Sequence, residues 1–106
     1  MEWQRIAPEE ELGAGLDVAL GAVAGGDRVA VFRTGEGLFA LDDICSHEYS
    51  RLSEGEVAEG QVACAKHGSR FDLRSGAVTG FPATLPVRSW AVKAEDGWIW
   101  VSRPAS

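Results

Sequence analysis

Two short segments of this 106-residue chain contain all of its cysteines and histidines. Cys45 and His47 are separated by one residue, and Cys64 and His67, further along the chain, by two. Each segment therefore offers one thiolate and one imidazole, which are side chains that bind transition metals. Two matched pairs of such ligands predict a metal centre to which both segments contribute, so that the two segments must fold against each other.

Three kinds of site would use some or all of these side chains. A disulfide between Cys45 and Cys64 leaves both histidines unexplained and conflicts with a reducing compartment. A tetrahedral zinc site accepts two thiolates and two imidazoles, but zinc fingers usually place two cysteines in one knuckle and two histidines in the other. A [2Fe–2S] cluster in which two histidines replace two cysteines on one iron uses all four ligands.

The ligand set of such a cluster decides its charge. Two ferric ions, two sulfides and two thiolates sum to a neutral oxidised centre, whereas four thiolates leave the centre negative. An electron is added more easily to a neutral centre, so histidine ligation raises the reduction potential to a range of roughly −150 to +300 mV, against about −400 mV for plant-type ferredoxins.

The residues around these segments are predicted to form short antiparallel strands. Apolar runs flank glycine-containing turns, which is typical of β-hairpins. The predicted turns lie at residues 34–37, 59–60, 74–76 and 95–97. Cys45 follows the predicted strand 38–41 and Cys64 closes the predicted strand 62–64, so that each pair opens a loop at a strand end, where functional residues are commonly carried.

The two ends of the chain carry weaker signals. Residues 9–12 are expected to form a helical turn and residues 16–20 a strand. Four tryptophans, which favour half-buried sheet positions, lie near the two ends. They are Trp3, Trp90, Trp98 and Trp100. Their placement predicts that both termini meet in one sheet.

Composition limits the classes of partner. Ten basic against sixteen acidic residues give a formal charge of −6, which argues against binding to nucleic acid or to an anionic membrane. An acidic surface suits transient docking on basic patches, although solubility alone explains it. There is no apolar stretch long enough to span a membrane and no leader-like N-terminus, so we expect a cytoplasmic protein.

The two ligand segments resemble the Rieske motif, C-x-H followed by C-x-x-H-G. The matching residues are Cys45-Ser46-His47 and Cys64-Ala65-Lys66-His67-Gly68. The flanking residues 52–55 and 70–76 are similar to small soluble Rieske ferredoxins of bacterial ring-hydroxylating dioxygenase systems. The strong resemblance runs from about residue 42 to residue 80, and its motif is specific because it requires four ligand types and a glycine.

This resemblance implies an all-β Rieske fold and one [2Fe–2S] cluster per chain. The expected fold is an antiparallel β-sandwich base with a small inserted cluster-binding subdomain of hairpins and two ligand loops. Residues 1–106 would form a single domain, with its cluster-binding part at about 42–80. By the family pattern, Cys45 and Cys64 would bind the inner iron, and His47 and His67 the outer iron. Residues 80–83 resemble the proline-containing loop that covers the cluster, although a simple turn fits them equally well.

The resemblance further implies a one-electron carrier rather than an enzyme. The chain would pass electrons from a ferredoxin reductase to a terminal oxygenase in aromatic hydrocarbon catabolism, and it is expected to be a monomer. The alternative is a Rieske-like small subunit of another redox enzyme, such as nitrite reductase. The expected docking site is the exposed tip around His47 and His67, with a rim of Glu48, Arg51 and Lys66.

Departures from the high-potential respiratory Rieske proteins predict a low reduction potential. Ser50 and Lys66 stand where those proteins carry two further cysteines that staple the ligand loops. Ser69 keeps a hydroxyl donor position of the family, but Phe71 replaces a tyrosine and has no hydroxyl to donate. Without that donor the reduced, more negative centre is less stabilised.

Overall fold

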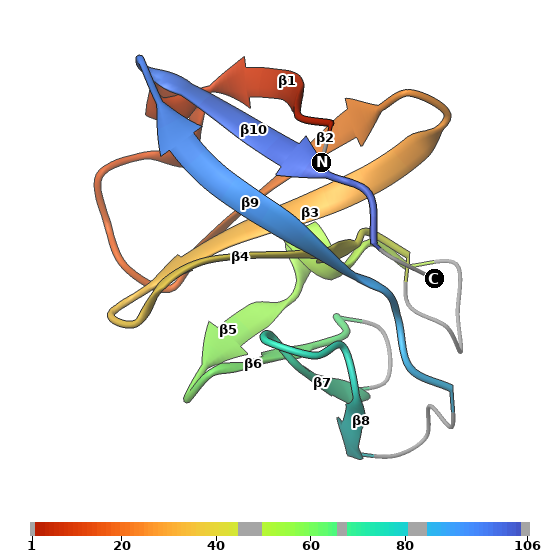
Figure 1. The fold of residues 1–106 in the computed structure, drawn as a ribbon. Helices are drawn as coiled ribbons and strands as arrows, with labels where there is room; N and C mark the ends of the chain where they lie inside the picture. Colours follow the sequence, from red (N-terminus) through yellow and green to blue (C-terminus); the bar gives the residue numbers. More distant parts are fainter. Residues whose placement is uncertain (1, 45–49, 66–67, 81–84, 105–106) are drawn as a thin grey trace.

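The chain folds into two antiparallel sheets, as the computed structural model shows for residues 2–44, 50–65, 68–80 and 85–104 (Figure 1). The larger sheet has the strand order β1-β10-β9-β4-β3-β2 and the smaller sheet the order β5-β6-β7-β8. Only two short 3₁₀ turns accompany the strands in these ranges, and neither is a helix of the length and apolarity that a membrane span requires. The predicted all-β class is confirmed.

The bounds of the elements follow the chain. The larger sheet contains β1 (Gln4–Pro8), β2 (Val18–Ala24), β3 (Asp27–Thr34), β4 (Gly37–Asp42), β9 (Ser89–Glu95) and β10 (Trp98–Ser102). The smaller sheet contains β5 (Glu56–Ala58), β6 (Gln61–Ala63), β7 (Arg70–Asp72) and β8 (Val78–Gly80). The 3₁₀ turns are η1 (Glu9–Leu12) and η2 (Leu52–Glu54).

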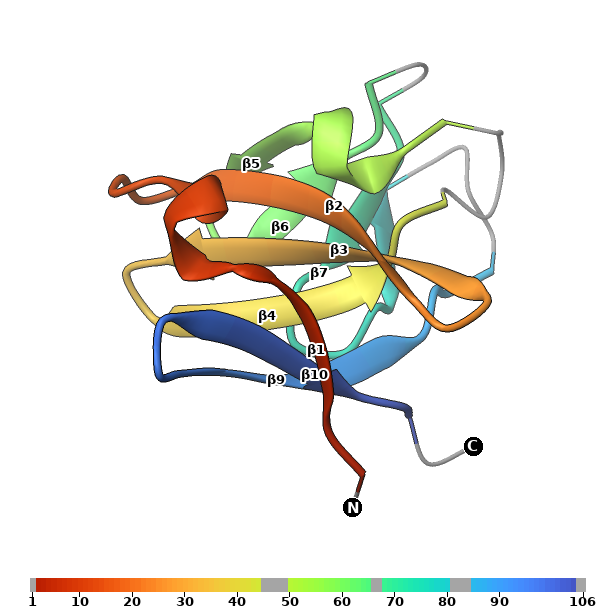
Figure 2. The ribbon, with the colours of Figure 1, turned by 90° about the horizontal axis from the view of Figure 1, so that it is seen from above.

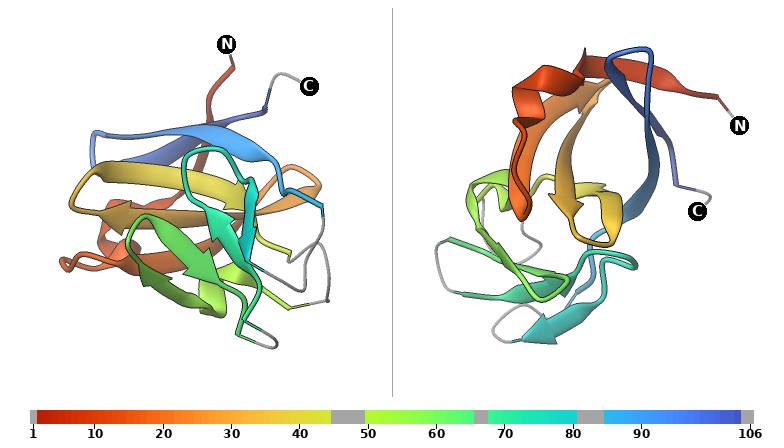
Figure 3. Two further views of the ribbon diagram at one scale, coloured as in Figure 1. Left: turned by 90° about the horizontal axis from the view of Figure 1, so that it is seen from below. Right: turned by 90° about the vertical axis from the view of Figure 1, so that its left-hand side faces the viewer.

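Strand β3 is buried on both faces and separates two cores. Successive side chains of a strand point to opposite faces, so Val29 and Val31 enter one core while Ala30 and Phe32 enter the other. The first core lies within the larger sheet, which curls until its outer strands β1 and β2 approach each other (Figure 3). The members of this core are Leu12, Ala24, Val29, Val31, Ala40, Trp90, Ile99 and Val101.

The second core joins the smaller sheet to the outer face of the larger one. Its members come from both sheets and from the segments between them. They are Ala30, Phe32, Leu41, Leu52, Val62, Cys64, Phe71, Leu73 and Val87. Burial of this apolar surface fixes the smaller sheet, and with it the loop that begins at Cys64, against the base of the molecule.

The predicted hairpins are confirmed, and their turns have the expected backbone. Glu59 and Gly60 join β5 to β6 with φ of 55° and 75°. Asp96 and Gly97 join β9 to β10 with φ of 55° and 80°. Positive φ at both central residues gives the tight turn whose twist matches the flanking strands, which explains why glycine stands second in each.

The N-terminal region differs in detail from the prediction. The expected helical turn at residues 9–12 is present as η1, but the strand expected at 16–20 begins later, at Val18, and continues to Ala24. Asp17 has a φ of 57°, which is incompatible with an extended strand and sets its start. Strand β1 was not predicted, yet it pairs with β10 and so brings the two ends of the chain into one sheet, as the tryptophans indicated.

The end of β4, which leads into the first ligand segment, lies at one end of the larger sheet. Strand β4 ends and β9 begins on this side, whereas η1 and the β3–β4 and β9–β10 turns lie at the opposite end (Figure 2). The antiparallel pairing of Leu41 with Ser89 fixes this arrangement.

Candidate metal centre

Of the four predicted ligands, the structure describes Cys64. Cys45, His47 and His67 lie outside the described residues, as do Glu48 and Lys66 of the expected docking rim. Within the described ranges no group of three or more metal-binding side chains occurs. The described part of the site consists of the stems of the two loops, which decide where the ligands are carried.

The second ligand loop is short and closed at its base by backbone hydrogen bonds. Cys64 follows β6 directly and is only 2% exposed. Its N–H donates to the carbonyl oxygen of Ser69 at 2.7 Å, and the N–H of Gly68 donates to the carbonyl oxygen of Cys64 at 2.9 Å. Gly68 has a φ of 75°, a backbone conformation that favours glycine and lets the chain return to β7.

The first ligand loop also has a closed stem. Ile44 and Arg51 form an isolated antiparallel bridge. Immediately beyond it, the N–H of Leu52 donates to the carbonyl oxygen of Asp43 at 3.0 Å. The residues on the two sides of segment 45–50 are thus paired with each other, between the end of β4 and the start of η2.

The two stems pack against each other. Leu52 is fully buried in the second core together with Val62 and Cys64. A Cβ on Gly55 would lie 2.1 Å from the carbonyl oxygen of Ala63, the last residue of β6. Only glycine permits this approach, which seats the end of η2 against the position where Cys64 begins its loop. The stems thus leave the base from neighbouring positions, as a centre shared by both segments requires.

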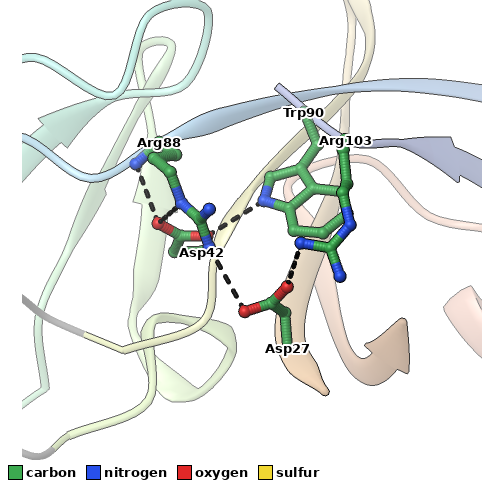
Figure 4. A network of polar contacts seen from close by, with 5 residues as sticks. All are labelled: Asp27, Asp42, Arg88, Trp90 and Arg103. Atoms are coloured by element: carbon green, nitrogen blue, oxygen red, sulfur yellow. Dashed lines mark hydrogen bonds and ion pairs between the residues drawn. The ribbon is translucent and has the colours of Figure 1, made fainter. Parts of the chain in front are cut away.

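A polar network joins the end of β4 to the start of β9 (Figure 4). Asp42 Oδ2 accepts hydrogen bonds from the backbone N–H and the Nε of Arg88, each at 3.0 Å, and Asp42 Oδ1 accepts one from Trp90 Nε1 at 2.9 Å. Arg88 and Arg103 both reach the carboxylate of Asp27, at 3.3 and 2.8 Å. This network ties the strand that leads into the first ligand loop to a distant part of the chain.

The same contacts shift the pKa values of their members. Burial by itself would raise the pKa of Asp42, but the hydrogen bonds from Arg88 and Trp90 outweigh it and lower the pKa below its ordinary value of 3.8. The carboxylate in turn raises the pKa of Arg88. Asp42 is therefore ionised at neutral pH.

A third segment reaches the same end of the molecule. The N–H of Val87 donates to the carbonyl oxygen of Gly76 at 3.0 Å, and the N–H of Asp42 donates to the carbonyl oxygen of Arg88. Residues 85–88 are thereby held between the β7–β8 turn and β4. They follow residues 80–83, the region expected to cover the cluster, of which residues 81–83 lie outside the described residues.

Two positions that the resemblance links to the reduction potential are buried. Ser69 is 1% exposed and Phe71, two residues along β7, is fully buried in the core that contains Cys64. Ser69 immediately precedes β7, and its carbonyl oxygen accepts the hydrogen bond from the N–H of Cys64.

Sequence reasoning did not identify Asp42, Asp43, Arg88 or Ser53 as residues that support the site. Single carboxylates before a cysteine carry no distinctive signal, and Arg88 is 46 positions away from Asp42 along the chain. The one signal in the sequence for these supporting residues was the pair of adjacent aspartates shortly before Cys45.

Comparison with known proteins agrees with this arrangement. The family profile described as the Rieske [2Fe-2S] domain matches residues 2–91. The anthranilate 1,2-dioxygenase ferredoxin subunit of Burkholderia cepacia is 41% identical over 101 residues, which cover 95% of this chain and 92% of that protein.

Solved structures share the fold. The ferredoxin of carbazole 1,9a-dioxygenase from Nocardioides aromaticivorans IC177 superposes with a TM-score of 0.85 at 32% identity, covering 96% of this chain and 98% of the other. A ferredoxin solved in a complex of reduced oxygenase and oxidised ferredoxin in carbazole 1,9a-dioxygenase gives a TM-score of 0.82 at 25% identity, covering 94% and 92%. On the family match and these similarities, the chain belongs to the Rieske [2Fe-2S] family.

Proposed function

We propose that this chain is the ferredoxin component of an aromatic ring-hydroxylating dioxygenase system, which carries one electron at a time from a reductase to a terminal oxygenase. The observation that carries the proposal is the match to a dioxygenase ferredoxin subunit over 95% of this chain and 92% of that protein. Similarity over nearly the whole of both chains supports the role of the entire subunit rather than that of a shared domain alone.

The proposed ligands are Cys45 and Cys64 for the inner iron and His47 and His67 for the outer iron. The described part of the site fits this assignment. Cys64 directly follows β6 in an apolar core, where a thiolate is shielded from water, and backbone hydrogen bonds join it to Gly68 and Ser69. The stem that leads to Cys45 and His47 packs beside it through Leu52 and Gly55. When bound, the cluster supplies a site that accepts and releases one electron.

The residues of this chain would set how easily that electron is accepted. The apolar, buried surroundings of Cys64 disfavour added negative charge and so lower the reduction potential. Hydrogen bonds toward the cluster stabilise that charge and raise the potential. By the family pattern the hydroxyl of Ser69 would provide such a bond, while Phe71 has no hydroxyl group. These two positions support a potential toward the lower end of the Rieske range.

The decisive experiment uses the purified holoprotein. Iron and acid-labile sulfide would be quantified, and the protein would be titrated anaerobically with dithionite while absorbance and EPR are recorded. The reduced protein would then be mixed in a stopped-flow instrument with the oxidised terminal oxygenase of an anthranilate dioxygenase system. We expect two irons and two sulfides per chain, uptake of one electron and rapid reoxidation by the oxygenase.

Different failures would have different meanings. A colourless protein without labile sulfide after anaerobic reconstitution would contradict the cluster and leave zinc as the metal to examine. A reducible cluster that no dioxygenase component reoxidises, but that a nitrite reductase catalytic subunit does, would retain the family and replace the proposed partner. Replacement of Cys64 by serine should abolish the histidine-ligated cluster signal.

A further inference from the structure

Two consecutive aspartates, Asp42 and Asp43, stand where β4 ends. Their side chains form hydrogen bonds with different parts of the molecule. Asp42, the last residue of β4, makes its contacts toward β9, whereas Asp43, the next residue, makes its contacts toward β3 and η2. One peptide unit therefore carries both anchors. Asp43 is 0% exposed, although it is an ionisable residue at the surface-loop end of a strand. Its burial therefore calls for a structural reason.

The carboxylate of Asp43 closes the neck of the first ligand loop. Its Oδ1 accepts a hydrogen bond from the N–H of Ser53 at 2.7 Å, and its Oδ2 accepts one from the Ser53 hydroxyl at 2.9 Å. Arg28 contributes an ion pair to Oδ2 at 3.5 Å. Asp43 and Ser53 lie on the two sides of the loop that carries Cys45 and His47, so that these bonds draw its ends together.

Backbone hydrogen bonds reinforce the same neck. The N–H of Asp43 donates to the carbonyl oxygen of Arg28, and the carbonyl oxygen of Asp43 accepts from the N–H of Leu52, both at 3.0 Å. Asp43 thus uses its N–H, its carbonyl oxygen and both carboxylate oxygens. Hydrogen bonds to a buried charged group are stronger than neutral ones and are costly to remove singly.

Strand β2 passes close to this contact at Gly21, which has no side chain to occupy the space. A Cβ on Gly21 would lie 2.7 Å from Asp43 Oδ2 and 2.8 Å from Ser53 Oγ. Any side chain at that position would displace the carboxylate or the hydroxyl. The glycine, the serine and the aspartate come from three separate segments and form one fitted contact, which a solvated loop charge would not need.

We propose that Asp43 is a positioning residue for the metal centre. Its buried carboxylate, held by Ser53 and accommodated by Gly21, sets the spacing of the two ends of the first ligand loop and thereby the placement of Cys45 and His47. The inference rests on the proposed function, because it assumes that these two residues bind the cluster. Asp43 would hold the ends of the ligand loop together and would not itself bind the cluster or carry the electron.

The chain provides a matched control for this contact. Asp72 Oδ2 accepts hydrogen bonds from the N–H and the hydroxyl of Ser75, both at 2.9 Å, in the β7–β8 turn. This second Asp–Ser contact has the same chemistry but spans no ligand loop. Ser53→Ala and Ser75→Ala each remove the serine hydroxyl from its aspartate and leave every charge of the protein in place. The Ser75 hydroxyl also accepts a hydrogen bond from the N–H of Ala77 at 3.1 Å, so the control loses one contact more.

The test compares these two variants with the wild-type holoprotein. We would record the EPR spectrum of the reduced state, the midpoint potential and the rate at which an iron chelator bleaches the cluster. Loss of a hydrogen bond to a buried carboxylate should accelerate bleaching in Ser53→Ala by roughly tenfold, with a changed EPR line shape. Ser75→Ala should retain the wild-type spectrum, potential and bleaching rate.

Asp43→Asn provides a second arm. It keeps an acceptor for the Ser53 N–H but removes the charge, so it should accelerate bleaching and alter the EPR spectrum in the same direction as Ser53→Ala. The proposal is overturned if Ser53→Ala and Asp43→Asn keep the wild-type spectrum and bleaching rate, or if Ser75→Ala changes them equally. Such a result on a wild-type protein that still reduces the oxygenase would leave the proposed function intact.

Discussion

By the family pattern, position 71 is where a single hydroxyl would act on the reduction potential. Phe71 is buried on β7 beside Val62 and shares a core with Cys64. Phe71→Tyr should raise the midpoint potential by about 60 mV, because a net hydrogen bond of about 1.4 kcal/mol to the reduced centre corresponds to that shift for one electron. Protein-film voltammetry or an anaerobic redox titration measures it.

Phe39→Tyr serves as the control for that measurement. Phe39 packs against the same core from β4 but pairs with Phe32 and stacks under Arg74, away from the ligand loops. Its hydroxyl should leave the potential unchanged. A potential that does not rise in Phe71→Tyr would show that the missing hydroxyl is not the cause of a low potential.

The lowered pKa of Asp42 makes part of the stability depend on pH. Because the folded-state pKa lies below the unfolded value of about 3.9, the contribution is present above that value and is lost as the pH falls through the folded pKa. Arg88→Gln removes one side-chain donor, so at pH 7 it should lower the free energy of unfolding by about 1 kcal/mol. The difference from wild type should shrink below about pH 4, where Asp42 is protonated in the variant and begins to be protonated in the wild type.

Urea unfolding at pH 7, 5 and 3 would measure this difference. Arg103→Gln is the control, because it removes an ion pair to Asp27 and leaves the Asp42 hydrogen bonds in place. A loss of stability in Arg88→Gln that stayed constant down to pH 3 would show that the contact with Asp42 is not its source.

Among the elements, the β7–β8 turn supports the segment that returns from the ligand end to β9. Gly76 has a φ of 77°, and a Cβ there would lie 2.0 Å from the carbonyl oxygen of Val87. Gly76→Ala therefore meets both backbone strain and a clash with the segment at residues 85–88. We expect a loss of at least about 3 kcal/mol in the free energy of unfolding, since strain alone accounts for about 1–2 kcal/mol.

Gly97 separates these two effects. It has a φ of 80° with nothing within 4 Å of an added Cβ, so Gly97→Ala should show the strain alone. Thermal unfolding of both holoproteins by circular dichroism would compare them. Equal losses in the two variants would mean that the close approach to Val87 contributes nothing.

Over the whole molecule, acidic side chains gather at the end opposite the ligand loops. The residues belong to η1, to the segment before β2 and to the turns of three hairpins, and Figure 2 shows where these elements lie. They are Glu9, Glu10, Glu11, Asp17, Glu36, Glu59, Glu95 and Asp96. Three of them, Glu9, Glu36 and Glu95, have ion pairs with Arg33, Arg74 and Lys93. Asp27, Asp42 and Asp43, near the stem of the first ligand loop, are likewise paired with arginines. This acidic group is thus separated from the stems of the ligand loops.

This separation predicts how docking depends on charge. The molecule extends over up to 39 Å, whereas salt screens charges within about 8 Å at physiological ionic strength. The triple variant Glu10→Gln, Glu11→Gln, Asp17→Asn should therefore leave the rate constant for reoxidation by the oxygenase unchanged, within experimental error, at about 0.15 M salt. Stopped-flow absorbance would measure it.

Arg51→Gln is the comparison at the ligand end. Arg51 is exposed at the stem of the first loop, so its removal should change both the rate constant and its dependence on salt. If the triple variant slows reoxidation about tenfold at this ionic strength and Arg51→Gln does not, the acidic end is the docking surface.

Local features of this protein could be predicted from the sequence. Residue type and spacing led to the proposal of Cys45, His47, Cys64 and His67 as ligands, and the backbone freedom of glycine predicted the turns at Glu59–Gly60 and Asp96–Gly97, which the structure shows. Ligand chemistry and tight turns involve residues a few positions apart, so a short stretch of sequence carries their whole signal. Strand β1 was missed because its pairing with β10, at the other end of the chain, decides its conformation.

The tertiary structure alone decided which distant residues support the site. Nothing near Asp42 in the sequence indicates Arg88, and nothing near Gly76 indicates Val87. Gly21 is required because β2 crosses Asp43 and Ser53, a contact among three separate segments. Such contacts arise when two cores are packed at once around β3, and their geometry depends on all the packed side chains together rather than on any local pattern.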